Sequence, residues 1–88
     1  MNDVRKDVEK IVREEHRQLL ENLLLLQHLY SIKELSEVLG ISRNTWKNRM
    51  EQPWRDFSYD DLRTLSRYCG IKFTHLVDGE LKVRGETA

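Results

Sequence analysis

Apolar residues recur at helical spacing along most of this chain, and few residues interrupt the pattern. The 88 residues include one Pro and four Gly, so long stretches hold nothing that breaks a helix. Residues 3–28 contain neither, and their pattern predicts one long first helix. Its sparse N-terminal half carries an apolar stripe made of Val4, Val8, Ile11 and Val12. Its leucine-rich second half should face a core through Leu20, Leu23, Leu24 and Gln27.

Residues 31–51 have the pattern of two short helices on either side of a Gly. Ser31 is a suitable N-cap for the first helix, and Ser42 for the second. Gly40 is a suitable stop between them, because a helix end favours a residue that adopts positive φ. The apolar positions at helical spacing are Ile32, Leu35 and Leu39 in the first helix and Trp46 and Met50 in the second. Helix, short turn and helix together predict a helix-turn-helix, a motif that reads DNA.

The outward face of the second of these helices carries side chains that suit DNA, namely Arg43, Asn44, Lys47, Asn48 and Arg49. Asn can bond adenine bidentately and Arg can do the same with guanine, while Lys and Arg neutralise phosphates. No acidic residue lies between positions 42 and 50. An ordinary solvated amphipathic helix is the alternative interpretation. The density of base and phosphate donors favours the nucleic-acid interpretation.

Residues 58–79 predict a fourth and a fifth helix. Ser58 with Asp61 has the form of a capping box, and Gly70 is a suitable end for the fourth helix. Its buried stripe should consist of Leu62, Leu65 and Tyr68. Thr74 is a suitable N-cap for the fifth helix.

The connecting segments carry weaker signals. We expect Pro53 to break the chain into a loop after the helix-turn-helix. Residues 80–88 fit a short strand or a loose tail. Together the apolar positions predict one packed core, made of Leu23, Leu35, Val38, Leu39, Ile41, Trp46, Leu62, Leu65, Phe73 and Leu76.

Composition limits the classes of function. The net charge is zero at pH 7, which argues against a nucleic-acid binder, but residues 42–55 hold four basic residues and one acidic residue. No apolar run approaches the ~20 residues of a membrane span and the N-terminus lacks a signal peptide, so we expect a cytoplasmic protein without a membrane partner. A single cysteine, Cys69, excludes an internal disulfide. No pattern indicates a metal site, a cofactor or catalysis, so we expect neither an enzyme nor a small-molecule substrate.

Two sequence blocks stand out, LSEVLGISRNTWKNRM at 35–50 and YDDLRTLSRYCGIKFTHLVDGE at 59–80. They resemble the phage repressor and Cro-type helix-turn-helix domains, the lambda-repressor-like fold also called the xenobiotic-response-element family. The resemblance implies an all-α, five-helix lambda-repressor-like DNA-binding domain over residues 1–88 with an extended first helix. It implies base contacts by Arg43, Asn44 and Asn48. Phosphate contacts are expected from Ser42, Thr45, Lys47, Arg49 and Arg55.

The chain departs from the family pattern in two places. Ile32 stands where the family commonly has a Gln that bonds phosphate, and the first helix is longer than usual. The added turns suit partner binding or dimerisation, or form an extension that contacts little. A dimer seam is expected either at the apolar stripe of the first helix or at Leu81 and Val83.

Two classes of function fit these observations. The first is a sequence-specific DNA-binding transcription regulator, a repressor or Cro-like protein of phage or prophage origin that binds double-stranded DNA as a homodimer. The second is a protein-interaction module on the same fold, such as an anti-repressor, an antitoxin or a phage accessory factor. The polarity of residues 42–50 favours DNA, whereas the zero net charge and Ile32 favour the second class.

Overall fold

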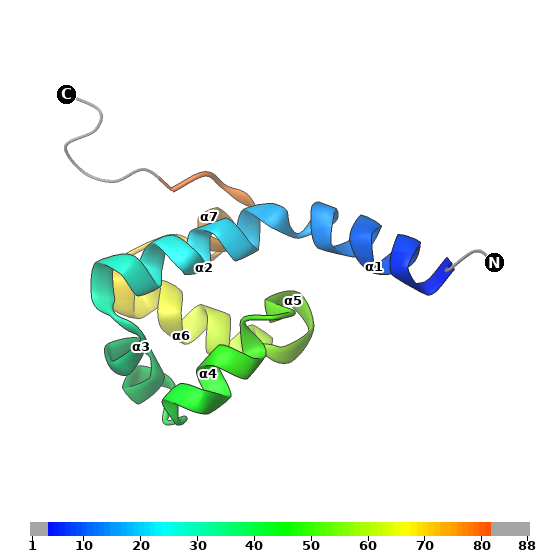
Figure 1. The fold of residues 1–88 in the computed structure, drawn as a ribbon. Helices are drawn as coiled ribbons and strands as arrows, with labels where there is room; N and C mark the ends of the chain where they lie inside the picture. The colour runs from blue at the N-terminus through cyan, green and yellow to red at the C-terminus, as the bar shows by residue number, and fades with distance from the viewer. Residues whose placement is uncertain (1–3, 82–88) are drawn as a thin grey trace.

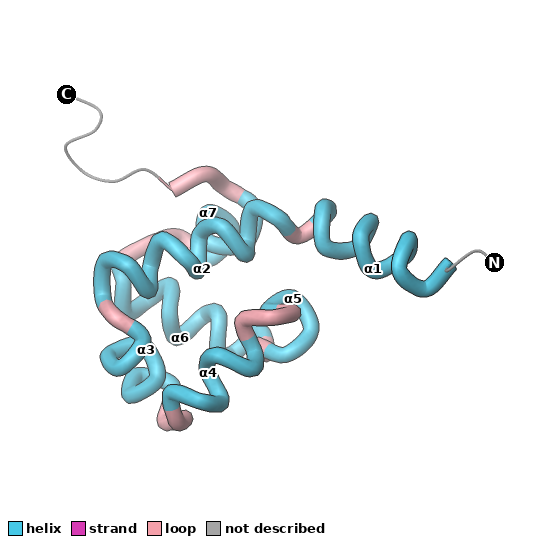
Figure 2. Tube along the Cα trace, viewed as in Figure 1, coloured by secondary structure: helices cyan, strands magenta, loops and turns pink. Residues whose placement is uncertain are grey.

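The computed structural model describes residues 4–81, which form seven helices and no strand (Figure 1, Figure 2). The helices are α1 (Val4–Glu15), α2 (Arg17–Tyr30), α3 (Ile32–Leu39), α4 (Arg43–Arg49), α5 (Pro53–Asp56), α6 (Tyr59–Cys69) and α7 (Phe73–Asp78). The predicted all-α class is confirmed. Figure 1 shows α2 to α7 gathered into one body, from which α1 extends, and the longest dimension is 48 Å.

The predicted single helix over residues 3–28 is wrong in one detail, because it breaks at His16. The backbone of His16 has φ −105° and ψ 16°, outside the helical range. Its N–H still donates to the carbonyl of Val12 (3.2 Å), and its carbonyl accepts from the N–H of Leu20 (3.2 Å). The two halves therefore follow one another almost end to end, with a one-residue irregularity between them.

Two expectations at the connections need correction, and a third lies mostly outside the described residues. Pro53 begins the short helix α5 instead of holding a loop, because the first turn of a helix does not need the N–H that Pro lacks. Lys72, not Thr74, is the N-cap of α7, and its side chain makes no cap hydrogen bond. Of the predicted strand or tail at 80–88, only the first two residues lie in the described range, and they are not helical.

The serine caps are where the sequence places them. The Oγ atoms of Ser31 and Ser42 accept hydrogen bonds from the backbone N–H three residues ahead (3.2 and 3.0 Å). Ser58 and Asp61 form the predicted capping box, each side chain accepting from the backbone N–H of the other (3.0 and 3.1 Å). Three helices therefore begin at residues that the sequence alone identifies.

Two helices end with the same chemistry. Gly40 and Gly70 adopt positive φ (68° and 69°), as a left-handed C-cap requires. The next residue in each case, Ile41 or Ile71, donates its N–H to the carbonyl of a buried serine five residues earlier (3.0 and 2.8 Å). Both serines are buried, and α3 and α6, the helices that carry them, are in contact with each other.

The core lies between α2, α3, α4 and α6, and α7 closes it. Its buried apolar side chains are Leu19, Leu23, Leu26, Leu35, Trp46, Phe57, Leu62, Leu65 and Leu76. Four predicted core residues are half-buried at its edge, namely Val38, Leu39, Ile41 and Phe73. Two expectations are wrong, because Leu24 and Tyr68 are 45% and 46% exposed. The hydroxyl of Tyr68 donates to the carboxylate of Glu34 at the surface.

Leu24 lies outside the buried stripe of α2, which instead includes a polar residue, Asn22, 2% exposed. The amide nitrogen of Asn22 donates to the carbonyls of Leu76 (2.8 Å) and Gly79 (2.6 Å) at the end of α7. Its Oδ1 accepts from the backbone N–H of Leu81 (3.4 Å). Helix ends leave carbonyls without partners, so one buried amide closes α7 and ties it to α2.

Candidate nucleic-acid interface

The outward face of α4 presents four polar side chains, those of Arg43, Asn44, Lys47 and Asn48, all exposed. Within the described residues 4–81, these side chains have no hydrogen bond or ion pair to the rest of the chain. Arg43, Asn44 and Lys47 line a surface hollow of 380 Å³ together with Ser42. Donors at the start of this helix are therefore exposed and available for a ligand.

Ser42 and Thr45 lie at the beginning of α4. The Oγ of Ser42 accepts from the N–H of Thr45 (3.0 Å) and donates to its hydroxyl oxygen (2.9 Å). Both predicted phosphate contacts are thus part of the helix cap, which fixes where their oxygens lie. Ser42 is exposed, and Thr45 is half-buried.

The inward face of α4 is held by Trp46, which is fully buried as predicted. Its indole Nε1 donates to Oε1 of Gln27 on α2 (2.9 Å). Its ring meets the Phe57 ring edge-on, with centroids 5.0 Å apart and planes at 63°. A buried indole N–H needs an acceptor, so Gln27 both satisfies the ring and fixes its position.

Arg49 turns toward the body instead of outward. Its Nη1 lies 3.0 Å from Oδ2 of Asp61 on α6, and its guanidinium lies 5.8 Å from the centroid of the Phe57 ring. The same carboxylate oxygen accepts the capping hydrogen bond from the N–H of Ser58 (3.1 Å). In this arrangement Arg49 anchors the C-terminal end of α4 and stands apart from the exposed donors.

Arg55 is separated from the α4 face and lies on α5. Its Nε and Nη2 bond the two carboxylate oxygens of the adjacent Asp56 (2.9 and 3.1 Å). This hydrogen-bonded guanidinium holds the pKa of the Asp56 carboxyl below its ordinary value. A phosphate that binds Arg55 must therefore compete with a neighbouring carboxylate.

The structure brings together six of the eight predicted contact residues on one end and face of α4, namely Ser42, Arg43, Asn44, Thr45, Lys47 and Asn48. It does not bring Arg49 or Arg55 to that surface. The anchoring partners Gln27 and Asp61 have no identifiable signal of this role in the sequence, because their contacts join residues 19 and 12 positions apart.

Two other features bear on the class of site. In the range 4–81, no three His, Cys, Asp or Glu side chains lie close enough to hold a metal ion. None of the helices in that range is sufficiently long and apolar to cross a membrane.

Comparisons with protein-family models, curated proteins and solved structures found no match to this chain. The functional assignment therefore depends on the chain's own residues.

Proposed function

We propose that this protein is a sequence-specific regulator that binds double-stranded DNA and reads the major groove with α4. The observation that carries the proposal is the division of α4 into two faces. Trp46 and Arg49 attach the helix to the body, while the outward face holds Arg43, Asn44 and Asn48, which have no partner among residues 4–81. Unengaged Arg and Asn side chains on a rigidly held helix are the groups that discriminate guanine and adenine.

We further propose that the body has the lambda-repressor-like arrangement. In this assignment α2, α3, α4, α6 and α7 correspond to the five helices of the family, with α3 and α4 as the helix-turn-helix. Helix α1 is then an extension of the first helix, and α5 occupies the loop after the recognition helix. The matching order of elements, the Gly40 turn and the capping box support this correspondence. Such proteins of phage or prophage origin act as repressors or Cro-like regulators, which is the role that we propose.

Two copies acting together suit this protein better than one. The recognition helix carries a small positive charge, and one helix reads one half-site, so a single copy should bind weakly. Paired copies would place two α4 helices about one DNA turn apart, ~34 Å. The exposed stripe of α1 is the better seam, because Leu81 already packs against the core and Val83 lies outside the described residues.

The proposal is tested by selecting sites from a randomised duplex pool and measuring affinity for the selected site. Arg43→Ala and Asn44→Ala should each weaken binding by roughly 1–3 kcal/mol and relax base preference. Lys47→Ala should weaken binding to all sequences and flatten the salt dependence by about one unit. Arg67→Ala, at an exposed position on α6, is the matched control and should change little.

A second function is favoured by the apolar stripe of α1, in which Val4, Val8 and Ile11 are each more than half exposed. An interaction module on the same fold would use it to bind a partner protein. Such a module would enrich no duplex from the pool, and the Arg43 and Asn44 variants would behave as the parent does. That outcome would remove the DNA-binding proposal.

A further inference from the structure

Helix α1 carries a basic stripe in addition to its apolar stripe. Lys6, Lys10 and Arg13 each follow the apolar residues Val4, Val8 and Ile11 by two positions. Each residue of a helix advances by about 100°, so a shift of two residues turns the basic stripe roughly 200° from the apolar one. The basic and the apolar side chains therefore point to different sides of α1, and only Val8 and Val12 of the apolar stripe also line the groove beside the basic residues.

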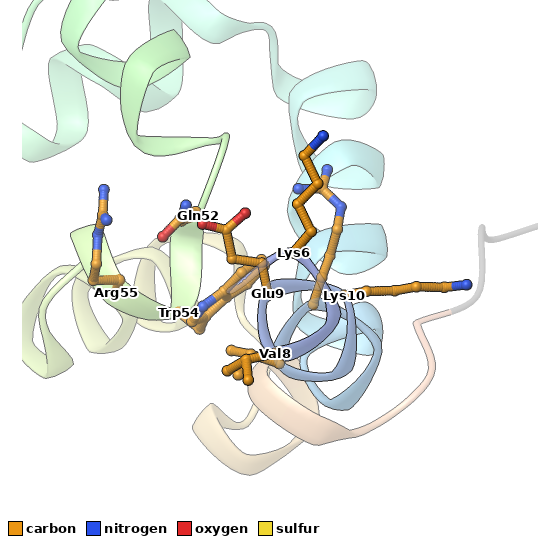
Figure 3. A pocket seen from close by; sticks show the side chains of 9 residues that line it. Lys6, Val8, Glu9, Lys10, Gln52, Trp54 and Arg55 are labelled. Carbon is orange, nitrogen blue, oxygen red and sulfur yellow. The ribbon is translucent and has the colours of Figure 1, made fainter. Parts of the chain in front are cut away.

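Helix α1 forms one wall of a groove of 530 Å³, and α5 with the residue before it forms the other (Figure 3). The α1 wall combines the basic stripe with Glu9 and with Val8 and Val12 of the apolar stripe. The lining holds four cations, Lys6, Lys10, Arg13 and Arg55, and one anion, Glu9. The apolar side chains of Val8, Val12 and Trp54 lie between them. The chain as a whole has no net charge. Figure 3 shows Lys6 and Arg55 on opposite walls with their ends pointing to the same side, while Lys10 points outward from α1. We call this feature the basic groove.

The basic groove has a fixed relation to α4. Nη1 of Arg13 donates to the carbonyl of Glu51 (3.1 Å), and the guanidinium lies 6.0 Å from the centre of the Trp54 ring. The His16 ring stacks on the same indole, with centroids 5.3 Å apart and planes at 10°. Glu51 lies two residues beyond the end of α4, so these contacts attach α1 to the segment that leaves the recognition helix.

We propose that the basic groove binds the phosphate backbone of DNA that flanks the stretch read by α4, an inference that rests on the proposed DNA-binding function. Lys6 and Arg13 lie ~10 Å apart along α1 at 1.5 Å per residue. With α1 along the duplex, that length faces about three phosphates of one strand, which are spaced ~3.4 Å along the axis. Arg55 is paired with Asp56, and the groove still holds three cations of α1 against the one anion Glu9, an excess of positive charge that favours phosphate.

The α1 cations also supply what α4 lacks. Of the charged residues predicted to contact phosphate, Arg49 is bonded to Asp61 and Arg55 to Asp56. Lys47 is then the main phosphate donor on the α4 face. One such donor is a small number for a protein that must hold DNA by charge. Flanking contacts from α1 would raise affinity without adding sequence preference, because phosphates carry no base information.

The test compares two synthetic duplexes by fluorescence anisotropy, using the full chain. One covers only the site selected for α4, and the other extends it by one helical turn of random sequence on each side. The parent protein should bind the extended duplex about ten-fold more tightly. This factor is the order of magnitude by which two phosphate contacts change the affinity when the salt concentration changes about four-fold. Lys6→Ala combined with Lys10→Ala should abolish that gain and leave the short duplex within about two-fold. For the extended duplex alone, the salt slope should fall by about two units.

The matched control is Lys72→Ala, an exposed lysine at the start of α7, which should keep the gain. The inference is overturned if extension brings no gain, if the double variant keeps the gain, or if it weakens both duplexes equally. A groove made for an acidic protein segment would give the first of these results. The proposed function fails separately, if no duplex is selected at all. Circular dichroism checks that the variants fold, which is expected since α1 buries no side chain.

Discussion

Helices α1 and α3 have equally clear amphipathic patterns, yet only α3 is part of the core. Leu35 and Ser36 of α3 are buried because α2, α4 and α6 surround that helix. Helix α1 buries no residue, and Val4 and Ile11 are 64% and 55% exposed. Periodicity thus determines which face of a helix is apolar, whereas the position of the helix in the fold determines whether that face is covered.

The largest expected effect lies in the body. Trp46→Ala should lower the free energy of unfolding by about 3–5 kcal/mol, because it removes a fully buried aromatic side chain. Guanidinium unfolding measures this loss. Trp54→Ala is the matched control, since Trp54 is half-buried beside α1, and its cost should be clearly smaller. Equal costs for the two tryptophans would mean that the α1 contacts contribute as much stability as the core.

A buried polar residue provides the next test of the body. Asn22→Ala should cost roughly 2–3 kcal/mol, because the carbonyls of Leu76 and Gly79 lose their donor in a buried place. Gln18→Ala removes a half-buried neighbour that donates to Oδ1 of Asn22 (3.1 Å), and it should cost less than about 1 kcal/mol. Urea unfolding of both variants compares them. A neutral Asn22→Ala would show that α7 does not depend on this amide.

In contrast to the body, α1 should contribute little to the free energy of unfolding. Deleting residues 2–12 should change the free energy of unfolding by no more than about 0.5 kcal/mol, since exposed positions contribute little. The same deletion should abolish association of two copies, measured by sedimentation equilibrium. Unfolding of the truncated protein would contradict the division between body and extension.

A point variant sharpens the assignment of the seam. Val8→Ser should weaken association, and Leu29→Ser, at an equally exposed leucine on α2, should not. If the truncated protein associates as the parent does, α1 is not the seam. A parent protein that stays monomeric at high concentration and on DNA would contradict dimerisation altogether.

The smallest expected effect is a pH dependence of stability that arises from the Cys69 thiol. Burial raises the pKa of the Cys69 thiol, and a hydrogen bond with Tyr30 offsets part of this increase. The unfolded chain therefore loses the thiol proton at a lower pH than the folded chain. The stability contributed by the neutral thiol is fully present below the ordinary pKa of roughly 8.5 and declines as pH rises past it. Urea unfolding at pH 7 and pH 9 should show a larger decline for the parent than for Cys69→Ala; an equal decline would contradict the raised pKa.

Local chemistry made much of this fold predictable from sequence. Ser31, Ser42 and Ser58 begin helices and Gly40 and Gly70 end them, because each of these signals depends on a few adjacent residues. The burial of Trp46 was predictable because it lies four residues before Met50, a helical spacing that places both on the inward face. The outward donors of α4 follow from the same spacing.

Contacts between distant residues were not predictable. Asn22 interrupts the leucine pattern of α2 as any exposed Asn would, and only the arrival of α7 makes it a core residue. In the sequence, Arg49 looks like a residue that contacts phosphate, because it is a cation close to Lys47. In the fold, Asp61 of another helix binds it. The helix breaks at His16 although no Gly or Pro lies there. The His16 ring stacks on the indole of Trp54, which is 38 positions away in the sequence.

The two faces of α4 have a consequence for how this protein can change. Arg43, Asn44 and Asn48 have no partner within the described chain, so exchanging them should leave folding almost untouched. Trp46 and Arg49, which hold the helix in place, need not change with them. New target sequences are therefore accessible through single substitutions that carry little risk to the fold. Related proteins with different targets would be expected to vary at the outward positions and to keep the inward ones.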